Sequence, residues 1–321
     1  MAVYNEQKLN LEKASELITI AQMPERYERE LHKTGSHEYA LKQLYDNAPS
    51  KYENNVSLVR SNNTTCVIVF DEEKNELTFA FDPTLDKGTV FNNADKWDNF
   101  NRGKTDHTLG GQVHSGLYSD LVDYNPDLAS GNLAETINAV IYDHAYRGNT
   151  ELKVNFTGFS KGGAQAALAV AEVAASEVFT LNDHIKLNDV ISFAPPGYGT
   201  EEFANSFNYL ANELDANVWT IELHGDAVPT VLTQDGANYF TKYDYTQFGN
   251  RAYITQNEQE TSVAINPSHE ELLKLRQQDQ PETPSHRSDS YKNAINNALS
   301  NDKDLDAPPP ALKANSLVFG Q

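Results

Sequence analysis

The sequence has 321 residues and carries 46 acidic against 25 basic side chains, which gives a formal net charge of −21. A surface with that charge repels phosphate backbones, and this excludes nucleic acid as an expected partner. A hydrophobic content of 39% predicts a folded core, while no apolar run reaches the ~18 residues that a bilayer-spanning helix needs.

The start of the chain lacks the basic and apolar regions of a signal peptide. We therefore expect a cytoplasmic protein, or one exported by a signal-independent route. The single cysteine, Cys66, lies in an apolar run and is expected to be a small buried hydrophobic residue.

Residues 1–60 are predicted to form a helical extension that packs on the main domain. Leucine and isoleucine recur at helical spacing between residues 5 and 47, amid glutamate and lysine. Pro24, and Gly35 with Ser36, are expected to separate two or three helices in this segment.

Residues 61–300 alternate apolar, strand-like runs with amphipathic helical segments. This alternation is typical of one α/β domain, in which helices flank a mostly parallel central sheet. The expected strands are 65–70, 76–81, 153–157, 189–194, 218–223 and 251–254. The expected helices are 133–146, 164–171, 201–210, 270–275 and 287–299, with a further one through residue 121. Residues 301–321 are expected to be a proline-containing C-terminal tail.

The stretch Lys153–Ala174 has the features of a nucleophile elbow. A strand-like run leads into the G-x-S-x-G pentapeptide of residues 158–162, and an alanine-rich helix follows. In this context the serine lies on a strained bend with its hydroxyl above the sheet, and the glycines leave room for the close strand–helix crossing. The stretch predicts Ser160 as a nucleophile, and a glycine-rich turn without chemistry is the alternative.

A serine nucleophile needs a base, usually histidine, and the histidine needs a carboxylate that fixes its tautomer. In folds with this elbow the chain order is serine, then an acid just after a strand, then histidine. Asp226 directly follows the strand expected at 218–223. His286 then precedes the last helix, where a loop can bring it over the serine, whereas His269 begins a helical run and could simply cap it. Order and spacing favour Asp226 as the acid and His286 as the base.

Five blocks, in the same order, resemble motifs of the class 3 lipase family of α/β-hydrolases. They are LTFAFDPT at 77–84, VHSGL at 113–117, TGFSKGGA at 157–164, SFAPPG at 192–197 and DAVP at 226–229. The matching family motifs are a strand ending in F-R-G-T, then V-H-x-G-F, G-H-S-L-G-G-A, T-F-G-x-P-R-x-G and D-x-V-P. The resemblance spans about residues 64–295 and implies an α/β-hydrolase fold. It implies Ser160 as nucleophile, Asp226 as acid and His286 as base, with Tyr291 in the helix that follows.

The implied oxyanion donors are Thr84 and the backbone N–H of Lys161. The sequence departs from the family pattern beside both of them. Asp82–Pro83 stands where the family has Arg–Gly, Phe159 replaces the histidine before the serine, and Lys161 replaces the leucine after it. We expect the Lys161 ammonium either to face a substrate phosphate or to pair with a carboxylate.

The predicted function is serine carboxylic-ester hydrolysis of acyl lipids or small esters, without a metal or cofactor. Residues 85–111, in the lid position, are mostly polar. This predicts an esterase or phospholipase, not a triglyceride lipase, with weak interfacial activation and transient contact with membranes or micelles. The resemblance implies a lipase or phospholipase A1-like enzyme. The alternatives are a lipase-like toxin effector that a partner neutralises and an inactive binding module that kept the fold. The sequence carries no prediction of the oligomeric state.

Overall fold

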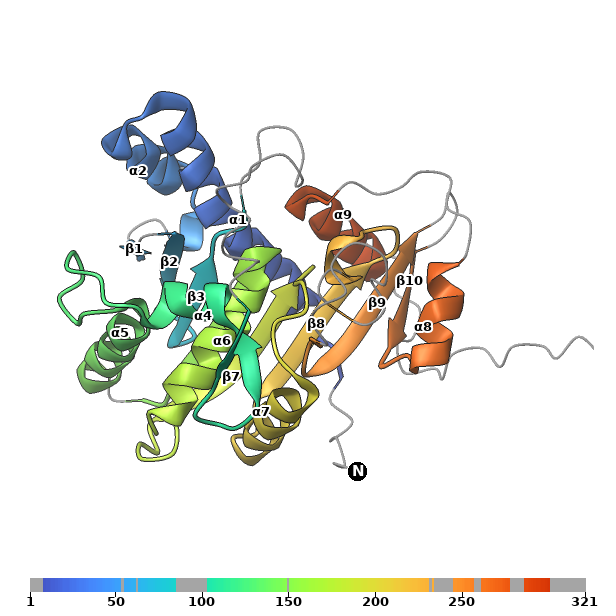
Figure 1. The fold of residues 1–321 in the computed structure, drawn as a ribbon. Coiled ribbons are helices and arrows are strands. Elements are labelled where there is room, and N and C mark those ends of the chain that lie inside the picture. Colours follow the sequence, from blue (N-terminus) through green and yellow to red (C-terminus); the bar gives the residue numbers. More distant parts are fainter. Residues whose placement is uncertain are drawn as a thin grey trace, which may run out of the picture.

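An eight-stranded sheet runs through the computed structural model of the chain, in the order β1-β2-β3-β6-β7-β8-β9-β10 (Figure 1). The structure describes residues 8–52, 55–61, 63–84, 103–148, 150–230, 233, 245–256, 261–277 and 286–300. The strands of this sheet are β1 (Val56–Ser61), β2 (Thr64–Asp71), β3 (Glu76–Phe81), β6 (Leu152–Phe159), β7 (Ile185–Phe193), β8 (Asn217–Leu223), β9 (Asn250–Gln256) and β10 (Thr261–Ile265). A second, two-stranded sheet pairs β4 (Lys104–Asp106) with β5 (Gln112–His114).

The strands β3, β6, β7, β8 and β9 run parallel, while β1, β2 and β10 add antiparallel strands at the two edges. The carboxyl ends of parallel strands meet at one edge of a sheet, where α/β folds place their sites. The register pairs Phe81 of β3 with Gly158 of β6, and Phe159 of β6 with Phe193 of β7. The segments that follow these strands therefore lie close together.

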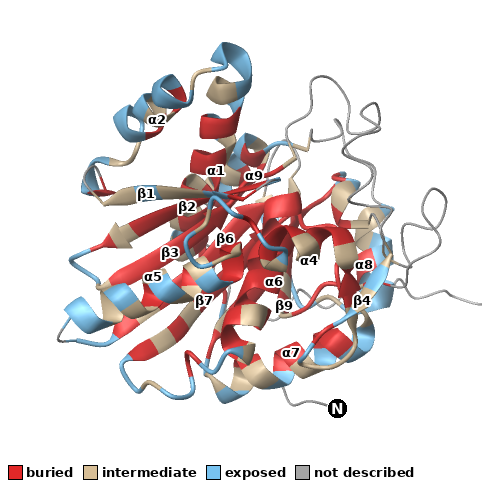
Figure 2. Ribbon diagram, turned by 60° about the vertical axis from the view of Figure 1, so that its left-hand side comes forward, coloured by how far each residue is buried: buried red, intermediate tan, exposed pale blue. Residues whose placement is uncertain are grey.

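Helices cover both faces of the sheet. The bounds are α1 (Leu11–Thr34), α2 (His37–Asp46), α4 (Ser115–Val122), α5 (Leu133–Arg147), α6 (Lys161–Ala175), α7 (Glu201–Glu213), α8 (His269–Arg276) and α9 (Ser288–Ser300). Short 3₁₀ turns lie at Ser50–Tyr52 and Val228–Thr230. One apolar cluster joins α1 and α9 to one face, and a second joins α4, α5, α6 and α7 to the other. The buried residues in Figure 2 follow this layering, with the strands at the centre.

The helix α1 is continuous through Pro24, so the break expected there is wrong. A proline inside a helix costs about 3 kcal/mol. Buried apolar side chains on both sides of it, such as Leu17 and Tyr27, each contribute roughly 1.5–3 kcal/mol and offset that cost. The expected break at Gly35 is confirmed: its φ of 68° is left-handed, and its N–H bonds to the carbonyl of Leu31 at 2.7 Å.

The N-terminal helix packs directly on the sheet. Contacts join α1 to β2, β3, β6 and α9, and Lys13 forms an ion pair with Glu76 of β3. The strand β1 crosses the boundary expected after residue 60, and the tail 301–321 lies outside the described residues. The division into extension, main domain and tail stays a prediction.

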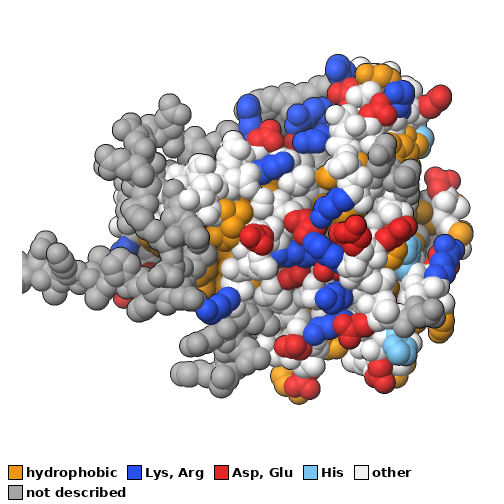
Figure 3. All heavy atoms as spheres, turned by 180° about the vertical axis from the view of Figure 1, so that it is seen from behind, with side chains coloured by type: hydrophobic (Ala, Val, Ile, Leu, Met, Phe, Trp, Pro, Cys, Tyr) orange, Lys and Arg blue, Asp and Glu red, His pale blue; other side chains and the backbone are white. Residues whose placement is uncertain are grey.

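Ion pairs reduce the effect of the strongly negative net charge on local surfaces. On the face seen in Figure 3, acidic and basic side chains lie interspersed. Glu16 of α1 accepts hydrogen bonds from Lys51 and Tyr52. Burial alone would raise the pKa of Glu16, but these bonds outweigh it and lower the pKa to about 2.

Cys66 is fully buried, as predicted, and burial raises the pKa of its thiol. No helix among the described residues is both long enough and apolar enough to cross a membrane.

Candidate active site

Ser160 lies on a strained turn between β6 and α6. Its φ of 58° with ψ of −125° is a backbone conformation that non-glycine residues rarely adopt. Its N–H donates to the carbonyl oxygen of Phe193 at 2.8 Å. A Cβ added at Gly158 would lie 2.2 Å from the carbonyl oxygen of Gly162, so the close crossing requires glycine. The strand, turn and helix of the predicted elbow are all present.

The structure brings Ser160, His286 and Asp226 together, although they lie far apart in the chain. His286 Nε2 is 2.8 Å from Ser160 Oγ, and His286 Nδ1 is 2.8 Å from Asp226 Oδ2. The Asp226 side chain is fully buried, and that of His286 is 18% exposed. A carboxylate at Nδ1 keeps the proton on that nitrogen, which leaves Nε2 free to accept the serine proton.

Further hydrogen bonds hold the Asp226 carboxylate in place. Oδ1 accepts from the backbone N–H of Val228 at 2.9 Å, and Oδ2 accepts from the Tyr291 hydroxyl at 2.8 Å. The Tyr291 oxygen in turn accepts from the N–H of Leu223 at 3.0 Å. Burial, and then the neighbouring carboxylate, raise the pKa of Tyr291 well above its ordinary value, so its hydroxyl remains a donor.

Two contacts that the sequence did not predict orient His286. Its ring stacks on Phe159, with centroids 4.7 Å apart and planes at 26°. The helix α9, which begins two residues after His286, is bound to α1. Ser288 donates to Glu25 at 2.6 Å, and Gln22 donates to Asp289 at 2.6 Å. No local sequence signal connects these two helices, because they lie at opposite ends of the described chain.

The other histidines considered have different surroundings. His269 is the first residue of α8, directly after the capping residue Ser268. His224 is buried, with Nδ1 at 2.9 Å from the Tyr253 hydroxyl. It is therefore His286, and not His269, that lies within hydrogen-bond distance of Ser160.

This geometry agrees with the result of a family comparison. Residues 79–236 match the model of the family described as lipase (class 3). This part of the chain belongs to the class 3 lipase family. The matched residues include Ser160 and Asp226, and His286 lies beyond them.

Solved fungal lipases have the same fold as this chain. A lipase from Rhizopus microsporus var. chinensis is 18% identical, with a TM-score of 0.53 over 82% of this chain and 82% of that chain. The triacylglyceride lipase of Rhizomucor miehei is 14% identical, with a TM-score of 0.54 over 89% of this chain and 95% of that chain. The α/β-hydrolase fold is thereby confirmed. No curated protein matches the chain.

Two departures from the class 3 lipase pattern are in direct contact. The Lys161 ammonium donates to Asp82 Oδ2 at 3.2 Å and to the carbonyl oxygen of Asn63 at 2.7 Å. Both charged side chains are only 9% exposed. Of the two roles expected for the Lys161 ammonium, pairing with a carboxylate is the one found, and contact with a substrate phosphate is not.

The two predicted oxyanion donors follow β3 and Ser160. Thr84 is half-buried and comes two residues after Asp82. Lys161 is the first residue of α6, where backbone N–H groups have no partner within the helix. Residues 85–102, most of the predicted lid, lie outside the described residues.

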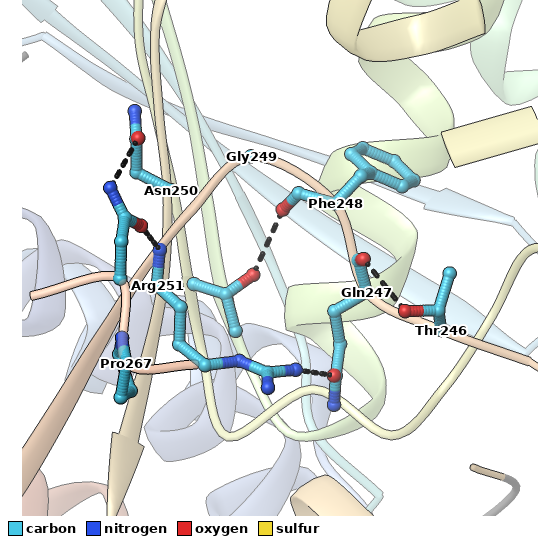
Figure 4. Close-up of a pocket in the computed structure, with 9 residues that line it drawn as sticks. Thr246, Gln247, Phe248, Gly249, Asn250, Arg251 and Pro267 are labelled. Carbon is cyan, nitrogen blue, oxygen red and sulfur yellow. Dashed lines mark hydrogen bonds between the residues drawn. The ribbon is translucent and has the colours of Figure 1, made fainter. Parts of the chain in front are cut away.

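A pocket of about 470 Å³ lies beside β8 and β9, and its lining includes none of the three candidate residues (Figure 4). Its polar groups bond to one another: Arg251 donates to Gln247 at 2.6 Å, and Asn266 donates to Asn250 at 2.9 Å. Arg251 also forms an ion pair with the buried Glu222. We assign this pocket no part in the chemistry. Among the described residues, no group of three or more His, Cys, Asp or Glu side chains is placed to hold a metal ion.

Proposed function

We propose that the protein is a serine carboxylic-ester hydrolase that acts on acyl lipids or small esters through an acyl-enzyme on Ser160. The hydrogen-bonded chain from Ser160 through His286 to Asp226 carries this proposal. It is the arrangement that lets a neutral imidazole take the proton of a serine hydroxyl. Membership of residues 79–236 in the class 3 lipase family supports an ester as the substrate.

In the first half of the proposed reaction, Ser160 Oγ attacks the ester carbonyl while its proton passes to His286 Nε2. The negative charge of the tetrahedral intermediate moves to the carbonyl oxygen, where the Lys161 N–H and Thr84 donate hydrogen bonds. The carboxylate of Asp226 stabilises the imidazolium. Collapse of the intermediate breaks the bond to the alcohol, which leaves with the proton from His286.

In the second half, a water molecule attacks the acyl-enzyme and gives its proton to His286 Nε2. The second tetrahedral intermediate expels the Ser160 oxygen, which recovers the proton, and the carboxylic acid leaves. Every proton that His286 accepts is returned within the cycle, so the reaction needs no cofactor.

For the substrate class, the ion pair of Lys161 removes the argument for a phosphate group. A neutral acyl ester is the class that the site supports best. The similar Rhizomucor miehei structure is that of a triacylglyceride lipase. The polar composition of residues 85–111 favours, for this chain, a substrate that is dissolved or dispersed over one in an oil droplet.

The test is a panel of a short p-nitrophenyl ester, tributyrin, a long-chain triglyceride and phosphatidylcholine. We expect the short ester to be hydrolysed best, with a rate that rises smoothly through the critical micelle concentration. Ser160→Ala should lower kcat about a thousandfold or more, because triad loss has that effect.

Hydrolysis of none of these esters, or a Ser160→Ala variant as active as the natural chain, would refute the proposal. A sharp rise at the critical micelle concentration, with the long-chain triglyceride as best substrate, would instead refute the weak interfacial activation alone.

A further inference from the structure

We propose that the ion pair between Asp82 and Lys161 is a positioning device for the oxyanion site. The inference rests on the proposed function, because it concerns the two groups that would receive the oxyanion. Lys161 carries one candidate donor on its own backbone, and Asp82 lies two residues before the other, Thr84. The side chains of the pair therefore join the two backbone segments that carry the donors. These segments must keep a fixed relative position if both donors are to form hydrogen bonds with the same substrate oxygen.

The contacts of Asp82 and Lys161 fix both partners. Asp82 Oδ1 accepts from the backbone N–H of Thr65 at 2.7 Å, and the Asp82 N–H donates to the carbonyl of Thr65 at 3.0 Å. The Lys161 ammonium lies 3.2 Å from Asp82 Oδ2 and 2.7 Å from the Asn63 carbonyl oxygen. The end of β3 is thus bound on one side to β2 and on the other to the first residue of α6.

The backbones beneath this ion pair are in contact as well. A Cβ added at Gly162 would lie 2.2 Å from the carbonyl oxygen of Phe81 and 2.8 Å from that of Asp82. This close contact fixes the distance between α6 and β3, but a glycine has no side chain that would stop α6 from sliding along β3. The ion pair restricts this sliding, because it joins specific side-chain atoms of Lys161 and Asp82.

Other charges lie near the pair. The Thr65 hydroxyl donates a hydrogen bond to Glu28 of α1, and Glu28 forms an ion pair with Arg60 at 3.3 Å. Burial raises the pKa of Asp82, and the Lys161 ammonium opposes that shift. The Lys161 ammonium and the hydrogen bond from the Thr65 N–H both favour the charged carboxylate, and the ammonium has the larger effect.

Loss of one partner should disturb the site more than loss of both. With the ammonium absent, the buried Asp82 carboxylate either takes up a proton or moves toward water, and Thr84 moves with it. With both charges absent, no unpaired charge remains to drive that movement. A direct electrostatic effect of the ammonium on the oxyanion predicts no such recovery, so the two roles are distinguishable.

The experiment compares Lys161→Met, Lys161→Arg and the double variant Lys161→Met with Asp82→Asn on a water-soluble p-nitrophenyl ester. Each keeps the backbone N–H at position 161. We expect Lys161→Met to lower kcat about 10- to 100-fold with KM changed by less than about threefold, which is less than loss of an oxyanion donor costs. Lys161→Arg should retain most of the activity, and the double variant should recover at least about threefold over the single one.

Lys186→Met is the matched control. Lys186 also pairs with an aspartate, Asp215, but at 3.5 Å and with side chains 38% and 75% exposed. Its kcat should equal that of the natural chain. Circular dichroism checks folding, and if Lys161→Met alone does not fold, Asp82→Asn decides: it keeps the ammonium, so a kcat about threefold or more below the natural chain supports the positioning role, and a natural kcat contradicts it.

Three results would overturn it: a folded Lys161→Met with kcat within twofold of the natural chain, a double variant with natural kcat, or no recovery in the double variant. Absence of ester hydrolysis by the natural chain would refute the proposed function instead. The activity of the natural chain is therefore measured before any variant is compared with it.

Discussion

Replacing His286 by alanine is expected to lower kcat for a soluble ester about a thousandfold or more, with little change in KM. The imidazole is the group within 2.8 Å of Ser160 Oγ that can accept its proton, and Asp226 Oδ2 lies 2.8 Å behind it. Loss of a triad member typically has an effect of this size, because the remaining members cannot act without it. Steady-state kinetics on the purified variant measure it.

His269→Ala is the matched control for this prediction. His269 is also a histidine beyond Asp226, but it begins α8 and was the alternative base on sequence grounds. Its removal should leave kcat within about twofold, as expected for a residue that takes no part in the reaction. The reverse pattern, with His269→Ala inactive and His286→Ala active, would mean that His269 is the general base.

Replacing Gly162 by alanine is expected to lower the free energy of unfolding by about 3 kcal/mol and to reduce kcat as well. The added Cβ would lie 2.2 Å from the carbonyl oxygen and 2.7 Å from the carbonyl carbon of Phe81. These are backbone atoms of β3, so α6 must move away from the sheet, and overpacking of this kind typically costs 1–3 kcal/mol or slightly more. Denaturant unfolding measures the loss.

Gly148→Ala is the control for the glycine substitution. Its φ is −90°, and the nearest atom to an added Cβ is the carbonyl oxygen of His144 at 3.6 Å. The free energy of unfolding should change by less than about 0.5 kcal/mol, as at most surface positions. Equal stability of the two variants would contradict the close packing of α6 on β3.

The elbow could be predicted because its information is local. Its three parts are contiguous in the chain: the strand-like run, the pentapeptide around Ser160 and the alanine-rich helix. The glycines of the pentapeptide indicate that the strand and the helix cross closely. Asp226 and His286 needed only chain order and strand context. The parallel strands β6 and β8 place Ser160 and Asp226 at the same edge of the sheet. The packing of α9 on α1 then holds His286 beside them.

Features that depend on distant residues were missed or left open. The strands β1 and β10 are edge strands with partly exposed side chains, so their hydrophobic pattern is weak. The rule that proline ends a helix failed at Pro24, because burial of the apolar side chains of α1 offsets the free-energy cost of the proline. The sequence left undecided which of many carboxylates pairs with Lys161. In the sheet, Phe81 at the end of β3 pairs with Gly158, so the next residue, Asp82, lies close to Lys161 and is its partner.

Reaction of the protein with a fluorophosphonate, followed by intact mass and peptide mapping, tests directly whether Ser160 is the nucleophile. A fluorophosphonate reacts with a serine only where a base activates the hydroxyl. We expect one adduct, on the peptide that contains Ser160, and none in Ser160→Ala. A protein that stays unlabelled, as an inactive binding module would, or an adduct on another residue, would contradict the assignment of Ser160 as the nucleophile.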